Sequence, residues 1–216
     1  MLDDEHKVTN YLYELFNKAQ PRVAFLKYVH KGKTTARKTF SDALKIFLEE
    51  NVPFILPEPD LILIFEDYRK LVDQYLIIAI EIKYFKNSRN ILKKLRQAFR
   101  EFGQPIRHYL FGFDSVVLLH VFSPEIKEEN IILNYSDLIK DVIMKLKLPI
   151  AYFSIKIING EIFEIYSPFK LDSPQNAEYI LQWIRNKCMD TRNPLLPDDE
   201  STLKRRRALK AALGIP

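Results

Sequence analysis

Cysteine and histidine, the residues of disulfides and zinc sites, are scarce in this sequence. Its 216 residues include one cysteine, Cys188, and four scattered histidines. A single thiol excludes a disulfide within the chain and suits a reducing compartment. One thiol and four histidines also leave too few ligands for a Cys/His zinc site, so oxygen-ligated metal is the metal chemistry that remains open.

Glycine and long apolar runs are scarce as well. The chain has five glycines, and its Gly-Lys-Thr-Thr piece at 32–35 resembles the end of a Walker A motif, but the motif requires a glycine where Lys27 stands. We therefore expect no NTPase and no nucleotide cofactor. No run reaches the roughly 18 apolar residues of a membrane span, and the acidic residues 1–5 lack a signal-peptide core. These features predict a soluble, cytoplasmic protein without membrane contacts.

The sequence contains enough apolar residues for a sizeable core. Of its residues 47% are apolar and 28% charged, which predicts one globular domain with a small appendage. We assign residues 1–190 to the domain and 191–216 to a linker and a basic C-terminal tail. The tail is expected to form a short helix bearing residues 204–207 and Lys210. Three roles stay open for it: contact with a phosphate backbone, contact with a second subunit, and a mobile tail.

Two apolar runs with a polar loop between them predict a β-hairpin. The runs are residues 61–65 and 75–85, and each is bounded by polar or turn-forming residues. If the hairpin is symmetric about residues 70–71, residues whose numbers sum to 141 lie opposite one another. Asp60 then faces Glu81, so two carboxylates are expected to meet at the end of the hairpin.

A lysine completes this group of charges. Side chains two apart on a strand point the same way, so Lys83 is expected beside Glu81. Residues 76–82 are apolar on both faces, which predicts a sheet covered on each side. Charges there are costly unless they are paired or bind a metal, and two carboxylates suit Mg²⁺ or Mn²⁺. The alternative is a Glu–Lys ion pair at a strand end, with Asp60 as a turn residue.

The residues Pro59-Asp60 and Glu81-Ile82-Lys83 resemble the signature of the PD-(D/E)XK nuclease superfamily. The resemblance covers residues 1–125. It implies an α/β, restriction-endonuclease-like α-β-β-β-α-β core with a mixed central sheet flanked by helices. The Asp would lie on the second strand and Glu-x-Lys on the third, and residues 1–190 would be the nuclease-like domain. Within the superfamily, the resemblance includes the Holliday-junction-resolvase-like nucleases of archaea or their viruses.

The resemblance also implies roles for individual residues. Asp60, Glu81 and the Ile82 carbonyl would hold Mg²⁺ or Mn²⁺, and Lys83 would orient the attacking water. Glu5 lies on the apolar stripe of a helix predicted over 3–19, and is the candidate for a helix-one glutamate that reaches the metal. Its alternative is a first-turn acid that stabilises the helix N-terminus. Some members of the superfamily have a helix glutamine, often as Gln-x-x-x-Tyr, and Gln97 is the candidate for it here. Glu101 stands four positions later, so the full pattern fails.

Basic residues are concentrated directly after the Glu81-Ile82-Lys83 motif, on a helix predicted over 89–102. Between Lys83 and Arg107 there are eight basic residues and one acid, Glu101. A one-signed stripe matches a phosphate backbone, although a solvated helix face is the alternative. Together with a basic loop at 30–38, this segment supplies the nucleic-acid-binding candidates: Lys31, Lys33, Lys86, Arg89, Lys93, Arg96 and Arg100.

The remaining segments complete the expected fold. We predict strands over 23–29 and 115–122, a helix over 41–49, a helix over 136–147 capped by Ser136, a hairpin around Asn159-Gly160, and a helix over 174–189. Trp183 is expected in the core or an interface.

The sequence thus predicts a metal-dependent nuclease that hydrolyses DNA phosphodiester bonds. A structure-directed endonuclease of recombination, repair or replication is the form we expect, acting as a homodimer because cutting two strands takes two sites. One alternative is a catalytically inactive nucleic-acid-binding protein on the same scaffold. Another is a structural protein that dimerises through its hairpin and final helix. The composition is typical of a thermophilic archaeon or its virus.

Overall fold

The computed structural model describes residues 4–19, 42, 44–48, 57–86, 91–100 and 103–216, and the backbone of 24–29. Seven strands of this described part form one sheet whose strand order follows the chain. The strands are β1 (Ala24–Val29), β2 (Leu61–Glu66), β3 (Tyr75–Phe85), β4 (Ser115–Phe122), β5 (Ile150–Asn159), β6 (Ile162–Ser167) and β7 (Gln175–Asn176). The helices are α1 (Glu5–Lys18), α3 (Ile91–Arg100), α4 (Gly103–Arg107), the 3₁₀ helix η1 (His108–Phe111), α5 (Glu129–Lys145), α6 (Ala177–Asp190) and α7 (Glu200–Leu213).

The sheet is mixed, and its pairings explain the pattern of connections. Strands β1, β2 and β3 pair antiparallel, β3 to β4 and β4 to β5 are parallel, and β5, β6 and β7 are again antiparallel. Parallel neighbours need a crossover. Helices supply it: α3, α4 and η1 lie between β3 and β4, and α5 lies between β4 and β5. The chain is therefore a mixed α/β fold, as the sequence predicted.

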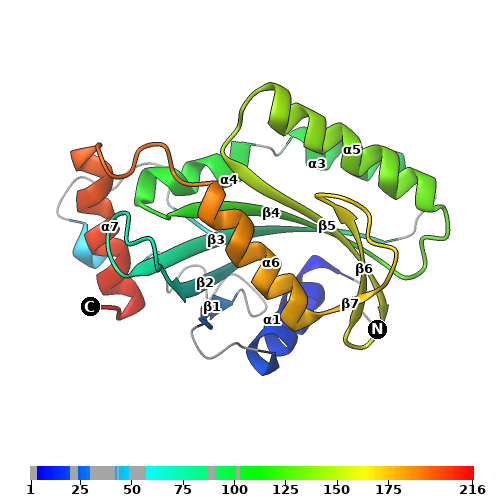
Figure 1. Cartoon of the computed structure of the whole chain (residues 1–216), viewed down its shortest axis with the longest axis horizontal. Coiled ribbons are helices and arrows are strands. Elements are labelled where there is room, and N and C mark those ends of the chain that lie inside the picture. Colours follow the sequence, from blue (N-terminus) through cyan, green and yellow to red (C-terminus); the bar gives the residue numbers. More distant parts are fainter. Residues whose placement is uncertain are drawn as a thin grey trace.

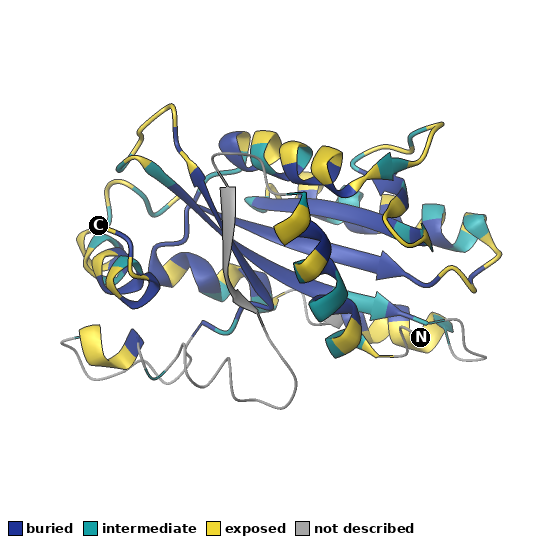
Figure 2. Ribbon diagram, turned by 90° about the horizontal axis from the view of Figure 1, so that it is seen from below, coloured by how far each residue is buried: buried dark blue, intermediate teal, exposed yellow. Residues whose placement is uncertain are grey.

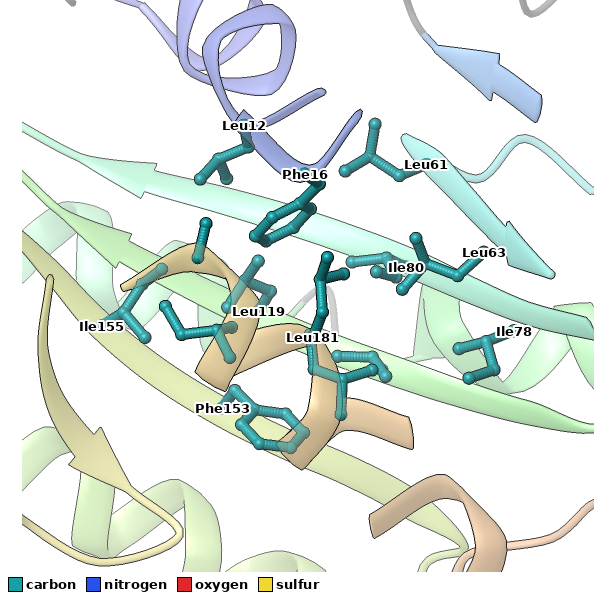
Figure 3. Packing of buried hydrophobic residues seen from close by; sticks show 14 of the residues in the cluster. Leu12, Phe16, Leu61, Leu63, Ile78, Ile80, Leu119, Phe153, Ile155 and Leu181 are labelled. Carbon is teal, nitrogen blue, oxygen red and sulfur yellow. The ribbon is translucent and has the colours of Figure 1, made fainter. Parts of the chain in front are cut away.

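Helices cover both faces of the sheet (Figure 1). On one face, apolar residues of α1 and α6 pack on β2 to β6; Leu12, Phe16 and Leu181 meet Ile80 and Leu119 there (Figure 3). On the other face there are two separate apolar clusters, one with η1 and α7 and one with α3 and α5. The central strands are accordingly buried along most of their length (Figure 2). Such two-sided burial explains why the strand sequences read as continuous apolar runs rather than as alternation.

Most of the predicted elements are confirmed, and two helix starts were wrong. The strand predicted over 115–122 has those bounds, and the Asn159-Gly160 hairpin forms, with Gly160 at φ +47°. Ser136 does not cap a helix, because α5 begins seven residues earlier at Glu129. Its buried hydroxyl instead lies 2.6 Å from Ser154 Oγ.

The second wrong start is that of the helix predicted from residue 174. The helix α6 begins at Ala177, after Asn176, whose side chain accepts a hydrogen bond from the Tyr179 N–H. Of the helix predicted over 41–49, residues 42 and 44–48 are described, and 42 and 44–47 are helical. Trp183 packs at the border of the core, edge-on to Phe153.

The basic C-terminal segment forms α7, which packs against η1 at one end of the sheet (Figure 1). Its Arg206 is 2% exposed. All five guanidinium N–H donors have acceptors, since the group bonds Asp73, Asp114, Gly112 O and Tyr75 O at 2.7–3.1 Å. A buried arginine needs this degree of pairing to offset its lost hydration. Arg206 thus fixes α7 to the sheet.

No helix that the structure describes has both the length and the apolar character of a membrane span.

Candidate functional site

The predicted hairpin forms with the predicted register. Strands β2 and β3 pair Leu61 with Ile80 and continue to Glu66 with Tyr75, so the residue numbers sum to 141 throughout. The ladder ends one residue short of Asp60. There the Asp60 N–H donates to Ile80 O at 2.9 Å, and Asp60 Oδ2 accepts from the Ile82 N–H at 2.8 Å. Asp60 therefore holds the main chain on both sides of Glu81.

Glu81 and Lys83 lie on one face of β3, between the two apolar clusters of that face. Ile77 and Ala79 belong to the cluster beneath α7, and Phe85 belongs to the cluster beneath α3 and α5. Alternation along the strand puts Glu81 and Lys83 between them on that face. Charged groups thus interrupt the apolar packing of this face, and their burial is costly unless they are paired or bind a metal.

The Glu81 carboxylate is buried and lies against His108 and Arg107. It is 3% exposed; its Oε1 lies 2.7 Å from His108 Nε2 and 3.8 Å from Arg107, which also lies 3.9 Å from Glu58. Burial acts to raise the pKa of Glu81, but the hydrogen bond and charge of His108, with the charges of Lys83 and Arg107, leave it lowered. The carboxylate is therefore ionised near neutral pH, as a metal ligand must be.

A cavity of about 320 Å³ opens beside Lys83. The structure brings three of the predicted site residues together in its wall: Lys83 from β3, Glu5 from the first turn of α1, and Gln97 from α3. Glu5 is half-buried and Gln97 exposed. A fourth polar residue of the wall, Lys94, was not among the predicted candidates. Helix and strand residues far apart in sequence thus converge on one small space.

The two carboxylates fit a magnesium or manganese ion by their chemistry. Asp60 and Glu81 are both nearly fully buried, and their hydrogen bonds to the Ile82 N–H and to His108 fix the positions of the two side chains. Among the described residues no group of three or more His, Cys, Asp or Glu side chains is arranged to hold a metal. Mg²⁺ is commonly bound through one or two carboxylates with water and substrate phosphate. The pair is sufficient for that mode.

The basic candidates are spread over different surroundings. Lys86 follows β3 and is half-buried, whereas Lys93 and Arg96 are exposed on α3. Arg96 lines a second cavity, which lies between α3 and α5. Arg100 ends α3 and is described by its backbone. The other three candidates lie outside the described residues: Lys31, Lys33 and Arg89.

The sequence did not predict the two residues that contact the Glu81 carboxylate, Arg107 and His108. Arg107 and His108 stand 26 and 27 positions after Glu81, at the junction of α4 and η1, so no local pattern connects them to the motif. One signal was available. His108 stands directly before the apolar residues 109–111 and the buried strand β4, and an imidazole in such a segment needs a buried polar partner.

Another buried histidine borders the site and gives a prediction for acid pH. His120 pairs with Lys83 across β3 and β4, and burial together with the Lys83 charge lowers its pKa to about 3. The unfolded value is near 6.5, so protons bind the unfolded chain more tightly. We expect stability to fall as the pH drops from about 6.5 towards 3. Imidazole NMR titration and denaturation at several pH values would measure both effects.

A His120→Phe variant provides the control for that prediction. It keeps a ring against Phe85 and Tyr135, which His120 contacts at centroid distances of 5.2 and 5.4 Å. The variant should lose the part of the acid destabilisation that His120 causes. A His120 signal that titrates near pH 6.5 would show that the ring is not held neutral by its surroundings.

Comparison with protein-family models, curated proteins and solved structures finds no match for this chain.

Proposed function

We propose that this chain is a metal-dependent nuclease that hydrolyses DNA phosphodiester bonds. The observation that carries the proposal is that Asp60 hydrogen-bonds the main chain of Ile80 and Ile82, the residues on either side of Glu81. Two buried carboxylates therefore lie next to each other at one strand end. Lys83 borders the cavity two residues further along that strand. Burying two carboxylates together costs desolvation free energy unless they are paired or bind a metal. Binding a metal ion for phosphodiester hydrolysis is one function that explains their presence.

The order of elements supports a restriction-endonuclease-like fold as the finer description. Along the chain α1, β1, β2 and β3 come before the helices α3, α4 and η1 and the strand β4, with helical residues at 42 and 44–47 between β1 and β2. Asp60 directly precedes β2, and Glu81 lies on β3. The resemblance of the Pro59-Asp60 and Glu81-Ile82-Lys83 motifs implies this α-β-β-β-α-β order. A short motif recurs by chance, so its agreement with an independent strand order adds weight to the proposal.

In the proposed mechanism, Asp60, Glu81 and the Ile82 carbonyl would hold a Mg²⁺ or Mn²⁺ ion. When bound, the ion lowers the pKa of a water and offsets charge that develops on the phosphate. Lys83 orients the attacking water and stabilises the negative charge of the phosphorus centre. His108 and Arg107 keep Glu81 ionised and fix its position. Glu5 and Gln97 are available to position water or substrate in the cavity.

The proposed partner is DNA, bound through basic residues near the site. Lys86 and Lys93 supply charge beside β3 and on α3, and affinity from such contacts falls with salt. We propose a homodimer, because cutting both strands takes two sites, and a cytoplasmic location. The buried, free Cys188 is compatible with a reducing compartment.

A second candidate is a nucleic-acid-binding protein without turnover on the same scaffold. The observation in its favour is that both carboxylates already have partners: Asp60 accepts from Ile82 N–H, and Glu81 lies 2.7 Å from His108. A group satisfied within the protein gains less from a metal ion. Metal titration discriminates the two candidates.

The test is a cleavage panel of labelled four-way junction, flap, single-stranded and duplex DNA with Mg²⁺, Mn²⁺ or EDTA. We expect cutting of at least one substrate with metal and none with EDTA. Salt-sensitive binding without cutting under every condition would favour the inactive scaffold. Neither binding nor cutting at low salt would overturn both candidates and leave a structural role.

A further inference from the structure

The basic residues of α3 do not share one environment. Consecutive side chains on an α-helix point about 100° apart, so two adjacent lysines lie on different faces of the helix. Lys94 lines the cavity beside Lys83, and Gln97, three residues later, lines it too. Lys93 is exposed and is not in the wall of that cavity, whereas Arg96 faces the space between α3 and α5. Lys94 and Gln97 are therefore the polar residues of α3 that face the proposed site.

The cavity has the composition of a small anion site. Its polar wall consists of two ammonium groups, Lys83 and Lys94, one amide, Gln97, and one carboxylate, Glu5; Tyr84, Phe85 and Ala98 form the rest. The formal charge of the wall is thus positive. Within the described residues Lys94 has no ion-pair partner. A few convergent polar groups on an apolar wall are typical of a ligand site.

The cavity lies beyond the carboxylates rather than on them. Asp60 and Glu81 are not among its wall residues, and Lys83 is the residue that borders both. A strand advances about 3.3 Å per residue, so Lys83, where the cavity begins, lies roughly 7 Å along β3 from Glu81. A group bound beside Lys94 is therefore displaced along the strand from a group bound between the carboxylates and Lys83.

We propose that this cavity binds a substrate phosphate next to the scissile phosphate, with Lys94 and Gln97 as its phosphate-binding residues. The inference rests on the proposed nuclease function and specifies its substrate class. The preferred substrate is a polynucleotide strand that carries a charged phosphate beside the bond to be cut. An isolated phosphodiester would leave the cavity empty. Lys94 contributes to binding and positioning, whereas Lys83 acts on the reacting phosphate.

The test replaces Lys94 and the substrate phosphate in a double-mutant cycle. After the cut has been mapped in an oligonucleotide, the phosphate on either side is replaced in turn by an uncharged methylphosphonate. With the all-phosphate strand we expect Lys94→Gln to raise KM roughly tenfold, with a smaller change in kcat, as for one lost charge-assisted contact. With one of the two methylphosphonate strands, Lys94→Gln and the unmodified protein should cleave alike.

Two further variants separate phosphate binding by Lys94 from the general effect of removing a positive charge near the DNA. Lys93→Gln removes the adjacent, exposed charge, and its penalty should be the same on phosphate and methylphosphonate strands. Gln97→Glu adds a negative charge inside the cavity and should raise KM for the all-phosphate strand. Circular dichroism establishes that each variant is folded, which is expected because Lys94 and Gln97 are exposed.

The outcomes distinguish this inference from the function on which it rests. If the unmodified protein cuts no strand, the nuclease proposal and the phosphate site fall together. If it cuts, but Lys94→Gln matches it or is equally impaired on all three strands, the phosphate site alone is overturned. Coupling of Lys93, rather than Lys94, to the neighbouring phosphate would overturn it as well.

Discussion

Replacement of Glu81 by glutamine is expected to lower metal-dependent cleavage by roughly three orders of magnitude or more, because loss of a metal-ligating charge removes several kcal/mol of transition-state stabilisation. Glutamine has the same shape and can still bond His108, which now lies 2.7 Å from the Glu81 carboxylate. The fold should therefore persist. Single-turnover rates at saturating protein, with Mg²⁺ and Mn²⁺, measure the effect on the chemical step.

A neighbouring acid supplies the matched control. Glu58 lies 3.9 Å from the same Arg107 but is 45% exposed at its side chain, whereas Glu81 is 3% exposed. Glu58→Gln should cleave within a few-fold of the unmodified protein, on the order of a surface ion pair's energy. DNA binding should survive in both variants. Cleavage by Glu81→Gln at the unmodified rate would remove Glu81 from the mechanism and with it the nuclease proposal.

The β2–β3 hairpin was predictable because its information is local. Two apolar runs and one polar loop define the strands, and symmetry about residues 70–71 gives the register observed from Leu61–Ile80 to Glu66–Tyr75. A register slip of one residue would move the strands' side chains to the opposite faces, so the apolar pattern specifies it strongly. The ends of the ladder are less determined, and there Asp60 bonds β3 through its side chain instead of continuing the pairing.

The start of α5 was mispredicted because a serine can either cap a helix or lie inside one with its hydroxyl bonded to another element. Ser136 precedes an amphipathic run and would be a good N-cap there. In the structure it faces Ser154 across the packed interface of helix and sheet, 2.6 Å away and buried. Which use applies depends on a residue 18 positions later, and a local pattern contains no information about that residue.

The pairing of Glu81 with His108 and Arg107 could not be predicted, for the same reason. His108 and Arg107 reach Glu81 only because the parallel crossover returns the chain over this end of β3. The motif residues could be predicted from spacing along one hairpin. To predict the residues that the crossover contributes, one needs the path of the chain in three dimensions. To predict that Lys94 and not Lys93 lines the cavity, one also needs the orientation of α3.

Replacement of Gly112 by alanine is expected to give the largest loss of stability among the glycines of the described chain. An added Cβ would lie 2.4 Å from Arg206 Cβ and 2.7 Å from Arg206 Cα, and Gly112 has φ +79°. The helix α7 would have to move, and the five hydrogen bonds of the Arg206 guanidinium would move with it. We expect a loss of about 3 kcal/mol or more, measured by urea denaturation.

Two other glycines separate the causes of that loss. Gly160 also has a positive φ, +47°, but an added Cβ would meet nothing within 4 Å, so Gly160→Ala measures backbone strain alone, about 1 kcal/mol. Gly103 has open space and no positive φ, and Gly103→Ala should change stability by no more than about 0.5 kcal/mol. The excess of Gly112→Ala over Gly160→Ala is the cost of displacing α7. If the two variants lose the same stability, Arg206 does not hold α7 tightly against η1, and the basic C-terminal helix is free to take one of the other roles that its sequence left open.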